Sequence, residues 1–410
     1  MTGKWSLRKS GGRSPGQSGR MTIEAVITGD NHLNLYNQKL GAKLGERRDR
    51  IGEAWYRTIE YAVKNKVDVY INTGDLFDQL SPRNPPRARV VEAFKRLNDA
   101  GIKAFILAGN HEAPTSIRDG ASPHTVLKEA GLATVFETYK EFEQEIATFK
   151  GIEVSVAGMS YDRGLGAGKD PLEDLEVPAG CDINIALLHY SLECVAPPIW
   201  EEPMIRLASL EKNSQVDLYA MGHIHRHIET SIGDSKVVYP GATEHYNFGE
   251  TNNETGFVVA RLESGNIKTE YIPVVAQPMR QVKLHVSTLD TKDPTSTVLQ
   301  EIDRASHPEG LLQLLLEGDT PFEHYTKLGF MRLFDEGTRR NFHFEYIDLI
   351  RPLVKGLEFK SGSGLNPRRE LEETAKQAMD DASEEEKRVW KQAIEYALSY
   401  YDKAREEQYV

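Results

Sequence analysis

The chain has 410 residues, of which 39% are hydrophobic and 27% are charged, and its formal net charge at pH 7 is −12. This composition is ordinary for globular proteins and no apolar stretch is long enough to cross a bilayer, so we expect a soluble protein without a role in the membrane. The negative charge disfavours nucleic-acid binding unless cations or a partner subunit compensate it locally, because phosphate groups normally bind to Lys and Arg.

The length predicts several units, because a domain typically holds about 100 to 200 residues. We place the boundaries at residues 1–20, 21–276, 277–355, 356–365 and 366–410. The first of these units is rich in Gly, Ser and Arg, carries basic residues without an acid, and lacks the apolar core of a secretory signal. We expect a disordered extension there, with a basic arm that binds nucleic acid as the alternative.

Short apolar runs alternate with amphipathic segments between residues 21 and 276, a pattern that indicates an α/β layered domain. The runs expected to form buried strands are 25–27, 67–71, 102–108, 183–188 and 216–221. Apolar residues at helical spacing and Pro near helix starts predict helices over 47–66, 86–100 and 123–129. The later runs 235–239 and 256–262 are typical of antiparallel strands, so we expect a four-layer α/β/β/α sandwich.

The pattern changes after residue 276. Strands over 281–286 and 311–317 flank a helix over 296–305, which predicts a small α+β module in residues 277–355. A Ser/Gly run makes residues 356–365 a flexible linker by composition.

Residues 366–410 are predicted to form a helical hairpin, because Asn366-Pro367 is a helix start and Ser383 with Glu386 is a capping box. The last helix carries an apolar stripe that either packs on its own domain or meets a partner, and we leave both readings open. Its members are Trp390, Ile394, Leu398 and Tyr401.

Polar signatures follow the buried runs, at the carboxyl ends where ligands bind in open α/β sheets. They are Asp30-Asn31-His32, Gly74-Asp75, Gly109-Asn110-His111, His189 and Gly222-His223-Ile224-His225. Each signature alone has a structural explanation, such as a turn for Gly74-Asp75 or a hydrogen-bonded core histidine for His189. Coincidence is a poor explanation for all five signatures together. The chain has only Cys181 and Cys194, which suits a reducing cytoplasm and leaves any metal to oxygen and nitrogen ligands.

Together these residues can hold two cations if Asp75 is shared. Carboxylate, amide and imidazole ligands without cysteine suit two Mn²⁺ ions best, with iron or zinc as alternatives. Two bound cations of this kind are typical of a phosphoester hydrolase. His111 lies beside them in the sequence pattern and can protonate a leaving oxygen. We assign one cation to Asp30, His32, Asp75 and His225, and the other to Asp75, Asn110, His189 and His223.

The order of these motifs resembles the calcineurin-like metallophosphoesterase superfamily over roughly residues 23–275. Within it, Gly74-Asp75-Leu76-Phe77-Asp78 with Ser81-Pro82, and the segment 239–250, are similar to the SbcD nucleases, relatives of the meiotic-recombination-eleven repair nuclease. The resemblance implies a manganese-dependent DNA nuclease in the nucleoid-associated cytoplasm, with 3′ to 5′ exonuclease and single-strand or hairpin endonuclease activity. His111 would be its catalytic histidine.

The same resemblance implies partners in double-strand-break repair. Residues 277–355 would be a capping domain over DNA, the helical hairpin would bind an SbcC-type coiled-coil ATPase, and the nuclease domain would form a homodimer. Candidate dimer residues, for which core packing is the alternative, are Ile51, Trp55 and Phe94.

Two positions depart from the resemblance. Glu112 stands where most relatives carry Asp, as a longer carboxylate expected to hold His111. Asp78 stands where some relatives place a histidine used in exonuclease action, which leaves the balance of endonuclease and exonuclease activity open. Near it, Arg83, Arg87 and Arg89 form either a basic rim for DNA or an ordinary solvated face.

Two other functions fit the sequence less well. A small-molecule phosphodiesterase or phosphatase would not need the extra module and the helical hairpin. A non-catalytic assembly subunit would leave seven polar ligands clustered without metal, which is costly in free energy.

Overall fold

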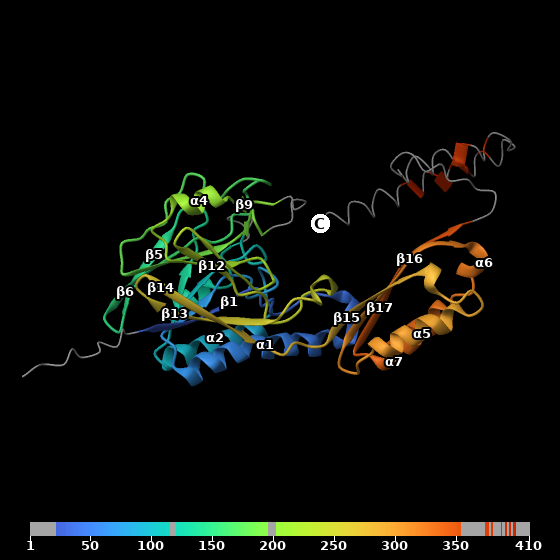
Figure 1. Cartoon of the computed structure of the whole chain (residues 1–410), viewed down its shortest axis with the longest axis horizontal. Helices are drawn as coiled ribbons and strands as arrows, with labels where there is room; N and C mark the ends of the chain where they lie inside the picture. The colour runs from blue at the N-terminus through green and yellow to red at the C-terminus, as the bar shows by residue number, and fades with distance from the viewer. Residues whose placement is uncertain are drawn as a thin grey trace, which may run out of the picture. The chain divides into compact units, whose positions relative to one another are not determined.

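The structure is a computed structural model that describes residues 22–114, 120–195 and 202–353. In the tail it describes the helical positions 374–376, 379, 387, 390–391, 393–394 and 397–398. The chain divides into a first unit that ends at Pro352 and a second unit that starts at Leu353. The paragraphs below concern the first unit, whose elements are labelled in Figure 1.

One six-stranded sheet carries the first three predicted strands. Its order is β14 (Asn266–Pro273), β13 (Gly256–Glu263), β1 (Ile23–Thr28), β2 (Val69–Asn72), β3 (Lys103–Leu107) and β4 (Thr134–Phe136). Strands β1 to β4 are parallel, whereas β13 is antiparallel to both β1 and β14. The carboxyl ends of β1, β2 and β3 therefore meet at one edge of the sheet.

A second six-stranded sheet carries the other two predicted strands. Its order is β11 (Ile228–Ile232), β12 (Ser235–Tyr239), β10 (Leu218–Gly222), β7 (Ile183–His189), β6 (Ile152–Gly158) and β5 (Glu143–Phe149). The four central strands are parallel, and the edge strands β11 and β5 are antiparallel. The antiparallel pairing predicted for 235–239 is therefore present with β11, but β12 also pairs in parallel with β10.

Alternation of side chains along the strands builds the layers. In β1, Val26 packs toward the helices, while its neighbour Ile27 packs in the core that the two sheets share with residues such as Val156 of β6. On the outer face of the second sheet, Leu210 of the short helix α4 (Leu207–Lys212) belongs to another buried cluster. The predicted four-layer α/β/β/α architecture is confirmed (Figure 1).

The predicted helices of the outer layer are present as α1 (Leu44–Asn65), α2 (Asn84–Asp99) and α3 (Thr125–Glu129). The apolar stripe of α1 is buried, as its helical spacing predicted. The three candidate dimer residues are wrong for that role, because Ile51, Trp55 and Phe94 are 2%, 1% and 0% exposed inside the chain's own core. Their apolar side chains are fully buried in the core of their own chain.

Residues 279–353 form a three-stranded sheet with its own core. Parallel strands β15 (Met279–His285) and β16 (Leu311–Pro321) are joined through α5 (Pro294–Ala305), and β17 (His343–Leu353) follows α7 (Phe330–Arg340). The two predicted strands and the helix between them are confirmed. Val298, Leu314 and Phe344 lie in the separate hydrophobic cluster of this sheet.

The remaining elements are short. They are the 3₁₀ helices Gln38–Lys43, Phe248–Glu250 and Val286–Thr288, the helix α6 (Phe322–Tyr325), and the small strands β8 (Ser191–Leu192) and β9 (Met204–Ile205). Among the described residues, none of the helices combines the length and apolar character that a membrane crossing requires.

Candidate metal centre

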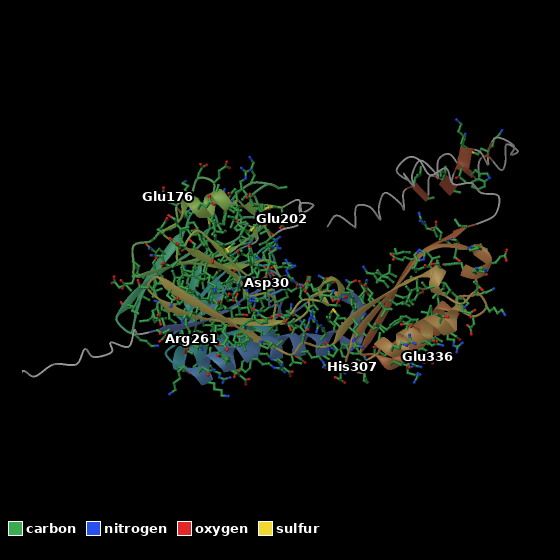
Figure 2. All side chains as sticks on the ribbon, viewed as in Figure 1. Asp30, Glu176, Glu202, Arg261, His307 and Glu336 are labelled. Atoms are coloured by element: carbon green, nitrogen blue, oxygen red, sulfur yellow. The ribbon has the colours of Figure 1, made fainter. Side chains whose placement is uncertain are left out.

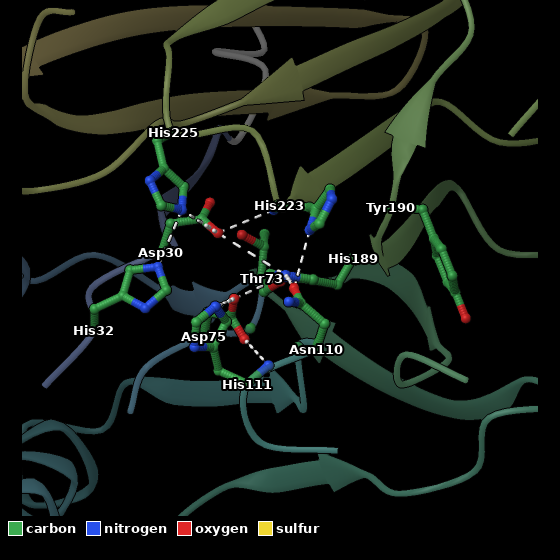
Figure 3. Close-up of polar contacts among 12 residues, drawn as sticks. Asp30, His32, Thr73, Asp75, Asn110, His111, His189, Tyr190, His223 and His225 are labelled. Carbon is green, nitrogen blue, oxygen red and sulfur yellow. Dashed lines mark hydrogen bonds and ion pairs between the residues drawn. The ribbon is translucent and has the colours of Figure 1, made fainter. Parts of the chain in front are cut away.

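The predicted ligands all lie where strands end, on both six-stranded sheets (Figure 3). Their strands are β1 for Asp30 and His32, β2 for Asp75, β3 for Asn110, β7 for His189, and β10 for His223 and His225. The structure therefore brings side chains from positions 30 to 225 to one place, as the strand-end pattern predicted.

The backbone at these positions is unusual for residues with a side chain. Asp30, His32, Asp75 and His223 have φ values of 49°, 48°, 50° and 88°. Such left-handed conformations are uncommon outside glycine and are found where surrounding structure and function enforce them. Two of these loops hold each other in place, because the N–H of Asp30 bonds to the Gly74 carbonyl at 3.0 Å and the N–H of His32 to the Asp75 carbonyl at 3.0 Å.

Close approach of the loops explains the glycine before Asp75. A Cβ at Gly74 would lie 2.6 Å from Nδ1 of His189 and 2.9 Å from the backbone nitrogen of Gly109, and the residue has a φ of 102°. Any larger residue would push the β2, β3 and β7 loops apart. Gly74 is thus required for the ligands to converge.

One group of donors gathers around His225. Its Nε2 lies 3.0 Å from Nε2 of His32 and 3.9 Å from Oδ1 of Asp30. The ligand atoms of these three residues all lie within 4.8 Å of one another. This group matches three of the four ligands predicted for the first cation.

A second group gathers around the amide of Asn110. Its Oδ1 lies 3.1 Å from Nε2 of His189 and 2.9 Å from Nδ1 of His223. His189 Nε2 also lies 3.3 Å from Oδ2 of Asp75 and 3.9 Å from Oδ1 of Asp30. Oδ1 of Asp30 thus lies 3.9 Å from a histidine of each group, and Asp75 lies within 4.8 Å of Asp30 and His189.

Three of the four imidazoles have a hydrogen-bond acceptor on the side away from the centre, and the fourth, His32, faces a carboxylate at ion-pair distance. His189 Nδ1 lies 2.8 Å from the Thr73 carbonyl, and His32 Nδ1 lies 3.4 Å from the Asp78 carboxylate. His223 and His225 are backed by Glu202 at 2.8 Å and Glu250 at 2.9 Å. An acceptor there holds the proton on the outer nitrogen and turns the lone pair of the other nitrogen inward, as in metal-ligating histidines.

The electrostatics of the centre favour bound positive charge. Burial lowers the pKa of His189, but Asp75 and Asp30 outweigh it and raise the pKa to about 9. Burial also lowers the pKa of His225, but Glu250 and Asp30 raise it to about 9. Burial works against the charged form of Asp75, yet the His189 imidazole holds the pKa of this carboxyl well below its usual range.

The residues fit divalent cations. Oδ2 of Asp30 is buried without a hydrogen-bond partner among the described residues, although an unpaired carboxylate oxygen inside a protein is costly. Oxygen and imidazole donors in one buried cluster are the ligands that Mn²⁺, iron and zinc accept. Asp30, His32, Asp75 and His225 would hold one ion, and Asp75, Asn110, His189 and His223 the other.

His111 lies at the rim, with 30% of its side chain exposed. Its Nδ1 lies 3.1 Å from the backbone carbonyl of Asp78 and 3.6 Å from its carboxylate, and its Nε2 lies 4.0 Å from Oδ2 of Asp75. The ring of Tyr246, which the sequence analysis did not single out, covers His32 at 4.4 Å and lies 6.0 Å from the His111 ring. Asp78 is therefore the carboxylate that supports both His32 and His111.

Glu112 does not support His111, contrary to expectation. The turn in which the N–H of Ala113 bonds to the Gly109 carbonyl sends Glu112 inward, where it accepts from the N–H of Phe77 at 2.5 Å and of Gly109 at 3.3 Å. Its Oε2 lies 2.9 Å from Nε2 of His124, and both side chains are fully buried. The sequence analysis missed His124.

The three arginines predicted to bind DNA lie at the start of α2. Arg83 donates from Nε to Asn34 at 3.1 Å, Arg89 pairs with Asp49 at 3.2 Å, and Arg87 is half-buried.

In the tail, Trp390 is 41% exposed and Ile394 and Leu398 are half-buried at helical positions, whereas Tyr401 lies outside the described residues.

Comparison with known proteins agrees with this geometry. Residues 24–227 match the calcineurin-like phosphoesterase family. The chain is 29% identical over 246 residues to the DNA double-strand break repair protein Mre11 of Methanopyrus kandleri, a match that covers 56% of this chain and 53% of the relative. It is 29% identical over 223 residues to the protein of the same name from Methanocaldococcus jannaschii, covering 53% of this chain and 56% of the relative.

These matches span about half the length of the two relatives. A match to the Mre11 protein of Methanococcus maripaludis has 27% identity over 290 residues and covers 67% of this chain and 73% of the relative. The matched family region contains all seven predicted ligand positions, from Asp30 to His225. Residues 24–227 therefore form a calcineurin-like phosphoesterase domain.

Proposed function

We propose that this protein is a two-metal DNA nuclease that processes DNA ends in double-strand-break repair. The observation that carries the proposal is the convergence of seven metal-ligand side chains, in which three of the four imidazoles have a hydrogen-bond acceptor behind them. The choice of DNA is supported by the relatives, which carry the name DNA double-strand break repair protein. The activities proposed are a 3′ to 5′ exonuclease and a single-strand or hairpin endonuclease, with Mn²⁺ as the metal.

The cations and His111 would have separate chemical roles. When bound, two divalent cations supply Lewis-acid stabilisation of the negative charge on a phosphoryl group. Protonated His111 contributes its Nε2 proton, because the Asp78 carbonyl accepts from Nδ1 and leaves Nε2 directed to the Asp75 side of the centre. The neutral ring that remains keeps its proton on Nδ1. We assign His111 the role of protonating the leaving oxygen, which its partial exposure allows.

Other parts of the chain are proposed to serve DNA and partners. Residues 277–355 would cap the DNA beside the centre, and Arg83, Arg87 and Arg89 would form a weak phosphate-binding rim. A homodimer is proposed through surface residues, since Ile51, Trp55 and Phe94 are buried.

The decisive experiment is a cleavage assay with the full chain and Mn²⁺ on end-labelled duplex, hairpin and circular single-stranded DNA. Loss of label from the 3′ end and nicking of the circle would support both activities. Intact DNA together with hydrolysis of a small aryl phosphodiester would replace the proposal by a small-molecule phosphoesterase. Bound Mn²⁺ without any hydrolysis would indicate a non-catalytic assembly subunit.

The partner is proposed to be an SbcC-type coiled-coil ATPase bound by residues 366–410. Exposed Trp390 on a helix with Ile394 and Leu398 supports this role for the tail. Removal of residues 366–410 should abolish co-purification with the ATPase and leave Mn²⁺-dependent cleavage intact. Co-purification that survives the deletion would refute the assignment.

A further inference from the structure

Two glutamates stand directly behind the paired histidines that follow β10. Oε2 of Glu202 lies 2.8 Å from Nε2 of His223, and Oε1 of Glu250 lies 2.9 Å from Nδ1 of His225. Neither glutamate received a role from the sequence, although Glu250 ends the segment 239–250 that supports the nuclease resemblance. Each contact lies within normal hydrogen-bond distance.

The two histidines turn opposite ring nitrogens to the centre. His223 presents Nδ1, which lies 2.9 Å from Oδ1 of Asn110, whereas His225 presents Nε2, which lies 3.0 Å from Nε2 of His32. A neutral imidazole carries its proton on one nitrogen only, and the acceptor beside the ring decides which. Glu202 therefore selects one tautomer for His223, and Glu250 selects the other tautomer for His225.

The two glutamates come from separate parts of the chain. Glu202 lies two residues before β9, where its side chain also accepts from the Ser191 hydroxyl (Figure 2). Glu250 lies in the 3₁₀ helix Phe248–Glu250 and accepts from the N–H of Tyr246 at 2.8 Å and from Nδ2 of Asn247 at 2.8 Å. Each glutamate is anchored by its own neighbours, so one can be lost without disturbing the other.

Other contacts fix the His223 ring as well. Tyr161 stacks on it with 6.1 Å between ring centroids and 24° between planes, and on Tyr190 at 4.7 Å and 24°. The stack restricts the plane of the ring but cannot choose which nitrogen holds the proton. Glu202, which lies at Nε2, can favour one of the two tautomers.

We propose that Glu202 and Glu250 are positioning residues that act on different cations. Glu202 orients His223 for the ion held with Asn110 and His189, and Glu250 orients His225 for the ion held with Asp30 and His32. This inference rests on the proposed two-metal centre and is independent of whether the substrate is DNA. Its consequence is that the two ions can be weakened one at a time by changes outside the ligand set.

The test is titration of the metal-free full chain with Mn²⁺, followed by calorimetry and electron paramagnetic resonance. Glu202→Ala and Glu250→Ala should each weaken one of the two Mn²⁺ ions by about 10- to 100-fold and leave the other unchanged. At intermediate Mn²⁺ the spectrum should change from that of a spin-coupled pair to that of isolated ions. Glu202→Gln and Glu250→Gln should restore much of the affinity, because the amide oxygen still accepts from the ring N–H.

A matched control is Glu193→Ala, since Glu193 is exposed and its backbone N–H bonds to the Ile205 carbonyl near Glu202. It should bind both Mn²⁺ ions as the unmodified chain does. Equal binding by Glu202→Ala and this control would overturn the role of Glu202. Equal weakening of both ions by either variant would overturn the separate roles.

Double variants assign each glutamate to its ion. Glu202→Ala should add no further loss to His223→Ala, because the residue that it orients is absent, but its loss should add to that of His225→Ala. The reverse should hold for Glu250→Ala. If the protein binds two Mn²⁺ ions with these couplings but does not cleave DNA, the proposed nuclease function is refuted and this inference stands. If the protein cleaves DNA but the couplings are absent, this inference is refuted and the nuclease function stands.

Discussion

The carboxylate of Glu112 and the imidazole of His124 form a buried pair, with 2.9 Å between Oε2 and Nε2 and no exposed surface on either side chain. Glu112 also accepts from the N–H groups of Phe77 and Gly109, which belong to the loops that carry Asp75 and Asn110. One side chain thus ties together two loops of the metal centre and the start of α3.

Replacement of Glu112 by Ala is expected to lower the free energy of unfolding by about 3 to 5 kcal/mol, because it leaves the buried His124 imidazole without its ion-pair partner and two N–H groups without an acceptor. Urea denaturation of the metal-free chain measures this. Glu129→Ala, at an exposed position of α3, should change the value by less than about 0.5 kcal/mol. A similar effect of both variants would show that the buried pair is energetically neutral.

Replacement of His111 by Gln is expected to lower kcat for DNA cleavage by about 100- to 10,000-fold, the usual contribution of a general acid. Mn²⁺ affinity should be unchanged, because His111 is not among the seven proposed ligands. Steady-state kinetics and Mn²⁺ calorimetry on the same preparation separate the two effects. Unchanged cleavage would remove His111 from the reaction, and lost Mn²⁺ would make it a ligand.

Removal of metal by EDTA is expected to abolish cleavage and to lower the melting temperature. The cation stabilises the folded chain by about 2.7 kcal/mol when its concentration is 100 times Kd, because it binds only where the donors converge. Thermal melts with increasing Mn²⁺ measure this effect. An Asp75→Asn variant should show little of the Mn²⁺-dependent rise, since it alters the shared ligand; a full rise in that variant would contradict the shared role.

The pair of Lys39 and Glu345 predicts a pH dependence of stability. His343, whose Nε2 lies 4.0 Å from Oε2 of Glu345, is the main cause that lowers the pKa of Glu345 to about 2, with Gln313 and Lys39 adding to it against the opposing effect of burial. Because the folded pKa lies below the ordinary 4.5, the stabilisation is complete above about pH 4.5 and is lost as the pH falls toward 2. The excess stability of the unmodified chain over Glu345→Gln should therefore shrink below pH 4.5.

Denaturation of both proteins between pH 7 and pH 3.5 tests this sign. A constant difference over that range would mean that the carboxylate titrates normally. Lys39→Met, which removes the partner at 3.0 Å, should reduce the difference without reversing it.

The ligand set could be predicted because its signal is local. Asp30, Asp75 and Asn110 each follow an apolar run, and the rule that ligands gather at the carboxyl ends of parallel strands needs only those runs. The same rule placed His189 and the β10 histidines without knowledge of strand order. The sheets then brought these ends together as predicted.

The supporting residues could not be predicted, because their contacts join parts of the chain that no periodic pattern links. Glu202 and Glu250 lie 21 and 25 positions from their histidines, in loops or a single 3₁₀ turn. The direction of Glu112 depended on a tight turn, which the expected contact with His111 did not take into account. Trp55 illustrates a related limit of sequence patterns. An apolar stripe on a helix does not distinguish packing against the core of its own chain from packing against a partner.

The pairing of β1 with β13 has a consequence for synthesis of the chain on the ribosome. Ile23 at the start of β1 is paired with Leu262, so the strand that carries Asp30 and His32 lacks one neighbour until translation has passed the whole α/β region. His225 is made 193 residues after the His32 that it faces. The nascent chain can therefore expose four of the seven proposed cation ligands long before the other three exist. The complete centre is assembled late, after the slow closure of long-range strand pairs.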